Sequence, residues 1–166
     1  MTPTDRIFDA RKIMFSLRSY TPLPFLVLMV VFARPSIVSI VSGFVLVILG
    51  ECVRFWGVSI AGAETRTTGT VGGTYLITNG PFAYVRNPLY VGNMLVYIGV
   101  GVMSMALFPW LIVAAAGWFF LQYTIIITGE EEYLRTRFGE AYGAYCREVH
   151  RFVPRAVPYR PAQMPP

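Results

Sequence analysis

The apolar stretch from Ile37 to about Ala61 constrains the fold of this chain more than any other feature of its sequence. It exceeds the roughly 20 residues that an α-helix needs to cross a bilayer, so it can span with some tilt. The whole chain of 166 residues is 55% hydrophobic, with a mean hydropathy of +0.54, above the apolar share of an ordinary soluble domain. We therefore expect a single domain embedded in a membrane.

Three further apolar stretches predict membrane-crossing helices, and two short turns that contain proline separate consecutive spans. The stretches are residues 19–33, which arginines bound at both ends, about 88–107, and 111–128. The turns are residues 34–36, where Ser36 is expected to cap the next helix, and residues 108–110. The sequence therefore predicts an all-α, polytopic membrane protein with about four transmembrane helices.

The distribution of basic residues predicts the orientation of these spans. The chain carries 14 Lys and Arg residues against 9 Asp and Glu, a net charge of +5. The basic residues flank the apolar stretches rather than forming a patch for nucleic acid, and only Arg34 and Arg54 lie away from the inner side. The positive-inside rule then places both termini in the cytoplasm. Asp5 and Asp9 interrupt the basic N-terminal segment, so we expect no cleaved signal and a mature chain beginning near Met1.

The connector from Asn79 to Gly92, inside which the third span begins, cannot form one continuous helix. Pro81 and Pro88 lack amide donors and push the residue before each of them out of the α region. Beside a bilayer, broken backbone persists only where its polar groups are buried in protein, line a wet cavity or meet a ligand. We therefore expect a site at this connector, on the same cytoplasmic face as the C-terminal segment.

Glu51 and Arg54 lie one turn apart within the second predicted span. Charged side chains at membrane depth cost several kcal/mol unless they are paired or solvated, so they mark a functional site by default. The alternative is a structural ion pair that bridges one helix turn. Function is favoured because Trp56 follows on an adjacent face and the pair lies in the half of the span nearer the broken connector.

An amphipathic C-terminal helix is predicted to open after Gly129, with three consecutive glutamates, residues 130–132, in its first turn. Its apolar residues recur at helical spacing, which indicates packing against the membrane or the other helices. Glu131 precedes Leu134 by three positions, so its carboxylate shares the buried side and favours a ligand over simple capping. Beyond about Pro158 the chain is expected to be irregular.

The single domain of residues 1–166 is expected to have four parts. They are an interfacial N-terminal segment or frayed tail (residues 1–17), the first two spans (19–61), a core that begins with a polar loop (62–154), and a Pro-rich tail (155–166). Cys52 and Cys146 are expected at different membrane depths and therefore unpaired. His150, the only histidine, is expected on the surface.

The residue types exclude several classes of chemistry. One histidine near the C-terminus provides no Ser-His-Asp or Cys-His arrangement, no cluster of metal ligands is present, and no Gly-rich phosphate loop occurs. What remains at the cytoplasmic face suits a zwitterionic, partly cationic cofactor: carboxylates for an ammonium or ribose hydroxyls, a guanidinium for a carboxylate, and aromatic faces for a base or a sulfonium. The residues are Phe82, Tyr84, Arg86, Asn87, Tyr90, Glu130 and Glu131.

The ordered combination of these residues with flanking motifs resembles a known family. The motifs are Gly80-Pro81, Arg86-Asn87-Pro88-Leu89-Tyr90 with Gly92, Glu130-Glu131 followed by Leu134, Phe138-Gly139, Tyr142, Tyr145, and Arg151-Phe152-Val153-Pro154, preceded by Glu51, Arg54 and Trp56. Over roughly residues 43–154 the chain is similar to the integral membrane methyltransferases, which include isoprenylcysteine carboxyl methyltransferase and phosphatidylethanolamine N-methyltransferase.

The resemblance implies S-adenosylmethionine as methyl donor, bound from the cytoplasmic side, with a lipid acceptor entering laterally from the membrane. It implies a cofactor site formed by Gly80, Pro81, Tyr84, Arg86, Asn87, Tyr90, Glu130 and Glu131, with no metal and no nucleic acid. One position departs from part of the family. The prenylcysteine enzymes usually have His where this chain has Asn87, whereas the phospholipid enzymes have Asn, so the acceptor stays open.

The catalytic residues expected from this reading are Glu51, Arg54 and Arg151. A carboxylate acceptor needs only a cation to orient it, for which Arg54 or Arg151 are candidates. An amine acceptor must first lose a proton, and Glu51 or Tyr90 can assist. We expect methyl esterification of the isoprenylcysteine type, with phospholipid N-methylation as the alternative. An NADPH-dependent reductase of the sterol type and a non-enzymatic membrane interaction protein are the alternatives of other classes.

Overall fold

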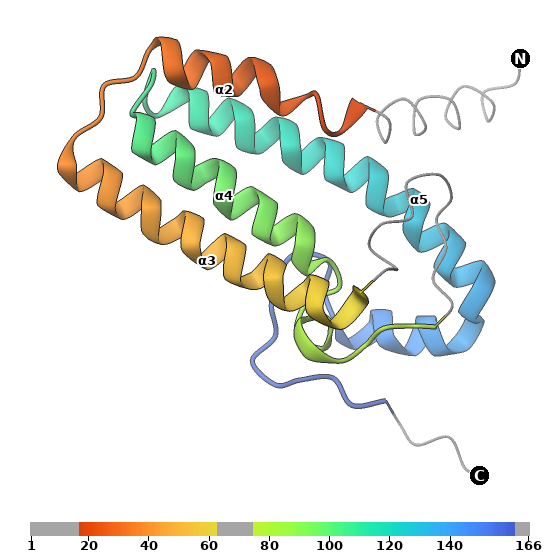
Figure 1. Cartoon of the computed structure of the whole chain (residues 1–166). Helices are drawn as coiled ribbons and strands as arrows, with labels where there is room; N and C mark the ends of the chain where they lie inside the picture. The colour runs from red at the N-terminus through yellow and green to blue at the C-terminus, as the bar shows by residue number, and fades with distance from the viewer. Residues whose placement is uncertain (1–16, 63–74, 162–166) are drawn as a thin grey trace, which may run out of the picture. The chain divides into compact units, whose positions relative to one another are not determined.

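A computed structural model of the protein describes residues 17–62 and 75–161, and within these ranges the chain is helical with no strand. The helices are α2 (Pro22–Val31), α3 (Ile37–Ala61), the 3₁₀ turn η2 (Gly80–Ala83), α4 (Pro88–Ser104) and α5 (Trp110–Glu148) (Figure 1). The predicted all-α class is confirmed. The expected interfacial segment at the N-terminus and most of the polar loop lie outside the described residues.

Two of the helices, α3 and α5, are long and apolar enough to cross a membrane. Only 17% of the most apolar window of α3 is buried within the protein, so its apolar side chains need lipid rather than water around them. The helices α2 and α4 are apolar but shorter, with 10 and 17 residues. The protein is therefore a membrane protein, and the expected number of four spans stays a prediction.

The chain divides into two compact units, and the long helices contribute residues to both. The first unit comprises Met1–Leu49 and Met94–Gly129, and the second comprises Gly50–Asn93 and Glu130–Pro166. All of the expected site residues, from Glu51 to Arg151, belong to the second unit. The first unit is therefore a helical body that contains none of the expected site residues, and the second contains all of them.

Small residues let helices approach closely within the first unit. A Cβ atom at Gly99 would lie 2.7 Å from the carbonyl oxygen of Gly43, so these two backbones pack directly against each other. The ring of Phe119 stacks on Tyr97 at 4.4 Å and lies 5.6 Å from Phe25, and α2, α4 and α5 lie side by side in Figure 1. Gly43 and Gly99 therefore serve the close approach of α3 and α4.

The turn before α3 is capped as the sequence predicts. The backbone N–H of Ser39 donates to Ser36 Oγ at 3.1 Å, and the N–H of Ser36 donates to Ser39 Oγ at 2.9 Å. This reciprocal pair satisfies two backbone donors that a helix start would otherwise leave unpaired. The helix therefore begins where the capping residue was predicted.

The expectation that a new helix opens at Glu130 is wrong. Helix α5 continues through Gly129, and its break falls at Gly139, whose φ of 51° and ψ of −122° are not helical. A glycine inside a helix costs only about 1 kcal/mol relative to alanine, so Gly129 is tolerated. Figure 1 shows the chain turning near the end of α5, in blue. Glu130 and Glu131 consequently project from the interior of a continuous helix rather than from a helix start.

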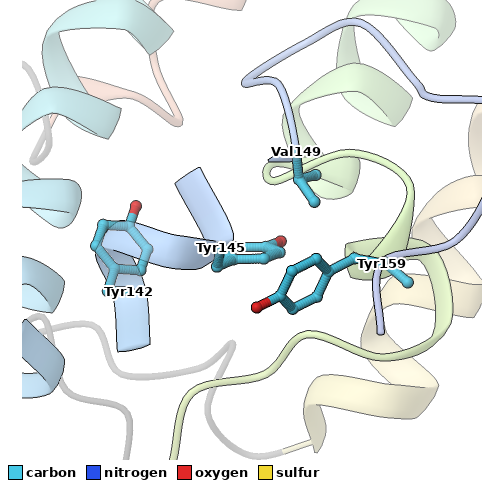
Figure 2. Close-up of a cluster of buried hydrophobic side chains, with 5 residues drawn as sticks. Tyr142, Tyr145, Val149 and Tyr159 are labelled. Carbon is cyan, nitrogen blue, oxygen red and sulfur yellow. The ribbon is translucent and has the colours of Figure 1, made fainter. Parts of the chain in front are cut away.

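The residues after α5 are irregular, but they are packed rather than loose. Tyr159 is only 9% exposed and joins a buried cluster with Ala83, Tyr142, Tyr145 and Val149. Figure 2 shows its ring beside that of Tyr145, and the two centroids are 5.2 Å apart in an edge-to-face arrangement. Tyr159 falls in the predicted Pro-rich tail, and its place in the core of the second unit was not predicted.

Candidate functional site

The broken connector obtains partners for its backbone from the C-terminal part of the chain. Two carbonyl groups and one amide of the connector pair with residues 150–159, which we call the C-terminal strap, and a third carbonyl pairs with α5. The four bonds join Tyr145 Oη to Phe82 O (2.6 Å), Tyr159 N to Ala83 O (2.9 Å), Arg155 N to Tyr84 O (3.0 Å) and Arg86 N to His150 O (2.9 Å). The polar backbone that the prolines break is therefore satisfied by protein.

Glu131 forms the centre of a charged cluster that links the connector, α5 and the strap. Its side chain is buried, and its two carboxylate oxygens accept hydrogen bonds from Arg151 Nε at 3.0 Å and Arg151 Nη2 at 2.6 Å. Arg86 Nη2 lies 3.3 Å from Glu131 Oε1. The carboxylate raises the pKa of Arg151, chiefly through this hydrogen bonding. Two guanidinium groups share one carboxylate, so this trio has an excess of positive charge.

One hydrogen-bond donor of this cluster, Arg86 Nε, has no acceptor among the described residues. Arg86 Nε is buried and has no hydrogen-bond partner among the described residues, and the Arg86 side chain is only 12% exposed. An unpaired buried donor of a charged group is costly, on the order of 1–3 kcal/mol or more. Its position beside an excess positive charge fits an anionic acceptor such as the carboxylate of an amino acid moiety.

The neighbouring polar residues of the connector are also paired with α5 and the strap. Tyr90 Oη donates to Glu130 Oε1 at 3.0 Å, and Asn87 Nδ2 donates to the carbonyl oxygen of Arg151 at 3.2 Å. The structure thus brings five of the eight expected cofactor residues and the expected Arg151 into one connected region of the second unit. The five are Arg86, Asn87, Tyr90, Glu130 and Glu131.

The remaining three expected cofactor residues shape the start of the connector. Gly80 has a φ of 56°, and a Cβ atom there would lie 2.7 Å from Ile60 Cγ1, so both its conformation and its space require glycine. Pro81 is buried within η2. The ring of Tyr84 is half-buried and lies 6.0 Å from that of Trp56. These contacts hold the connector against the end of α3.

Glu51 and Arg54 form an ion pair with each other, whereas Glu131 is paired with Arg86 and Arg151. Arg54 Nη1 lies 2.7 Å from Glu51 Oε1, and the two side chains are 41% and 52% exposed. This is the geometry of the structural alternative, an ion pair across one turn. The stem of Arg54 faces Gly92, where an added Cβ would lie 2.5 Å from Arg54 Cγ.

Two buried tyrosines of α5 lie next to the cluster. Burial raises the pKa of Tyr142, and the negative charge of Glu131 adds to this effect. Burial also raises the pKa of Tyr145, with the charge of Arg86 acting in the opposite direction. The Tyr145 hydroxyl donates to the carbonyl oxygen of Phe82, as described above. The sequence names both tyrosines only as motif residues and predicts no polar role for them, since helical spacing alone does not reveal what a phenol contacts.

The two cysteines are unpaired and His150 is exposed in the described region, as expected, while the membrane depths of the cysteines stay predictions. Cys52 and Cys146 are both free thiols. The side chain of His150 is exposed, while its carbonyl oxygen accepts the connector bond described above. His150 therefore contributes to the site through its backbone.

Comparison with known proteins identifies relatives along most of the chain. A sequence profile of the phospholipid methyltransferase family matches residues 38–141. The cobalt-zinc-cadmium resistance protein CzcN of Cupriavidus metallidurans is 34% identical over 119 residues, covering 71% of this chain and 50% of that protein. The protein-S-isoprenylcysteine O-methyltransferase of Schizosaccharomyces pombe is 34% identical over 79 residues, covering 48% of this chain and 33% of that protein. The chain thus spans half or less of the length of these relatives.

The fold also matches a solved structure. The eukaryotic intramembrane Ras methyltransferase, isoprenylcysteine carboxyl methyltransferase, aligns with a TM-score of 0.62 at 21% identity, covering 96% of this chain and 56% of that chain. The strap, with Arg151 and Tyr159, lies beyond the residues that the family profile matches. On the profile match over residues 38–141, the chain belongs to the phospholipid methyltransferase family.

Proposed function

We propose that this protein is a membrane methyltransferase that uses S-adenosylmethionine to methylate an acceptor embedded in lipid. The observation that carries the proposal is the buried cluster of Arg86, Glu131 and Arg151, in which Arg86 Nε has no partner among the described residues. The cluster joins the connector to α5, the two elements whose motifs resemble the membrane methyltransferases. Membership of the family supports the same activity.

The residues present fit the polar groups of this cofactor. Arg86 Nε suits the carboxylate in the methionine part of S-adenosylmethionine, because a guanidinium N–H without a partner is a good donor to a carboxylate. Glu130, with Tyr90 on one oxygen, suits the ammonium or the ribose hydroxyls. The half-buried ring of Tyr84 suits the base or the sulfonium. In this assignment Glu131 also holds the two arginines, and Asn87 also holds the strap. Gly80 and Pro81 shape the backbone around the cofactor.

When bound, S-adenosylmethionine supplies a methyl group that its sulfonium already activates for in-line displacement. The task of the protein is then to hold the acceptor close and aligned in a dry site, which can lower the barrier by on the order of 7–11 kcal/mol. A carboxylate acceptor needs a cation to orient it, and Arg54 or Arg151 presents one that is partly exposed. For an amine acceptor, Glu51 would accept the proton, or Tyr90 would assist its removal.

We propose a prenylated cysteine carboxylate or a similar lipidic acid as the acceptor. The name of the Schizosaccharomyces pombe relative supports it. The family description favours the second candidate, an ethanolamine phospholipid methylated on nitrogen. In the proposed topology four helices cross the membrane, and both termini and the site face the cytoplasm.

The two acceptors are separated by the base stability of the product. The purified protein is incubated with S-adenosylmethionine labelled in the methyl group and with either a farnesylcysteine analogue or phosphatidylethanolamine vesicles. An ester releases labelled methanol in base, whereas an N-methyl group stays on the lipid. Base-labile label on the farnesylcysteine analogue is the expected result. Base-stable label on phosphatidylethanolamine selects the second candidate. The proposal is contradicted if no methyl group is transferred to any lipid and the protein instead transfers hydride from NADPH to an enone lipid.

A further inference from the structure

We propose that the C-terminal strap (residues 150–159) is a positioning element that sets the affinity of the cofactor site, and that Tyr159 is its anchor. The inference rests on the proposed function and extends it to a segment beyond the family profile match at residues 38–141. It concerns only contacts within the second unit of the chain.

The strap pairs with the connector at three places spread along its length. Its residues 150, 155 and 159 form backbone hydrogen bonds with Arg86, Tyr84 and Ala83 at 2.9, 3.0 and 2.9 Å. Because the order along the strap is reversed relative to the connector, the two segments run in opposite directions. Three bonds between two irregular segments fix their mutual register better than one. The strap therefore determines where the connector backbone lies.

Tyr159 holds the far end of the strap in the core. It is 9% exposed, and its ring packs at 5.2 Å against Tyr145, whose hydroxyl donates to Phe82 O at 2.6 Å. Figure 2 shows Tyr145 and Tyr159 side by side. Tyr159 is therefore held in two ways, by the packing of its ring and by the hydrogen bond from its backbone N–H to Ala83 O. Its neighbour Arg160 is exposed.

The beginning of the strap contributes the charged side chain of Arg151 to the site. Arg151 supplies two hydrogen bonds to Glu131, and the carbonyl of Arg151 accepts from Asn87. The amide of Arg86, whose side chain holds the open donor, is bonded to His150. A displaced strap therefore moves Arg86 and Arg151 together. Cofactor affinity should then fall.

The test compares Tyr159→Ala with Tyr159→Phe, which keeps the ring, and with Arg160→Ala, a matched exposed neighbour. Tyr159→Leu keeps apolar volume and serves if the alanine variant does not fold. Two quantities are measured on the full chain in detergent: binding of S-adenosylhomocysteine by calorimetry, and amide hydrogen exchange without ligand. Exchange is followed in peptides covering residues 82–86 of the connector and 94–104 of α4.

The expected result is binding about tenfold weaker, or more, in Tyr159→Ala, with wild-type affinity in Tyr159→Phe and Arg160→Ala. Exchange should become faster in residues 82–86 and stay unchanged in residues 94–104. Wild-type affinity in Tyr159→Ala overturns the proposal, as does faster exchange in both regions, which would mean a general loss of stability. If the wild-type protein binds no S-adenosylhomocysteine, the proposed function fails, and the ligand-free exchange comparison still decides whether the strap holds the connector.

Discussion

Arg86 Nη2 on the connector lies 3.3 Å from Glu131 Oε1 on α5. This ion pair joins the two stretches of sequence that carry most of the polar chemistry, and both side chains are largely buried. Breaking a buried pair by removing one partner is costly because it leaves a charge without compensation. The pair is therefore the point at which fold and proposed function meet.

Tyr145→Phe is expected to destabilise the protein. The substitution removes the hydroxyl that donates to Phe82 O at 2.6 Å and leaves a carbonyl in the connector without that partner. The expected cost is about 1–2 kcal/mol of unfolding free energy, measured by denaturation in detergent. Tyr75→Phe is the control, because Tyr75 is 69% exposed. Equal stability of the two variants would contradict the assigned role of Tyr145.

Replacing Arg54 is expected to affect the acceptor and not the cofactor. Arg54 and Glu51 contact each other and are both substantially exposed, so Arg54→Gln should change stability by less than about 1 kcal/mol. We expect a higher KM for the lipid acceptor with unchanged affinity for S-adenosylhomocysteine. Arg34→Gln, at an exposed arginine outside the second unit, serves as control. Weaker S-adenosylhomocysteine binding in Arg54→Gln would place Arg54 with the cofactor instead.

Stability is expected to fall in strongly alkaline solution because of the buried phenols. Burial raises the folded-state pKa of Tyr142 and Tyr145 above the ordinary value of 10.0. The unfolded chain therefore loses these protons first, so the stabilisation is complete below pH 10 and is lost as pH rises beyond it. Tyr142→Phe should make the unfolding free energy less dependent on pH above this value. An unchanged pH dependence, followed with phenolate absorbance, would show that Tyr142 does not contribute.

Gly99→Ala is expected to disrupt packing in the first unit. The new Cβ would lie 2.7 Å from the carbonyl oxygen of Gly43, and neither backbone can move aside easily. Overpacking of this kind costs about 1–3 kcal/mol. Gly117→Ala is a matched control, because its added Cβ would meet no described atom within 4 Å beyond the adjacent residues and the backbone of its own helix. Thermal unfolding of both variants should show a loss only for Gly99→Ala, and similar curves would contradict the close approach.

Local sequence rules predicted the helices well where they acted alone. The length of the apolar stretch predicted α3 with its bounds, and Ser36 caps it as predicted. The ends of α2 and α4 were predicted less well, since these helices stop at Val31 and Ser104, two and three residues before the predicted ends. The break of α5 was misplaced because Gly129 and Gly139 look alike as single residues. Only tertiary context decides which of two helical glycines departs from helical geometry.

The site was predictable in part. Motif residues on the connector and α5 do meet, as the pairs of Arg86 with Glu131 and Tyr90 with Glu130 show. Arg151 was expected in the site, but the three backbone bonds between the strap and the connector were not predicted, because hydrogen bonds between backbone groups leave no pattern of residue types in the sequence. Tyr159, in a Pro-rich segment without helical or strand periodicity, offers no pattern that distinguishes a buried tyrosine from an exposed one.

The central claim is tested most directly by calorimetric titration of S-adenosylhomocysteine into the purified wild-type protein, Glu131→Gln and Glu132→Gln. Glu131 is buried between two arginines, whereas the side chain of Glu132 is exposed. The account predicts saturable binding to the wild type, affinity lower by about tenfold or more in Glu131→Gln, and near-wild-type affinity in Glu132→Gln. No binding to the wild type, or equal affinity of all three proteins, would contradict it.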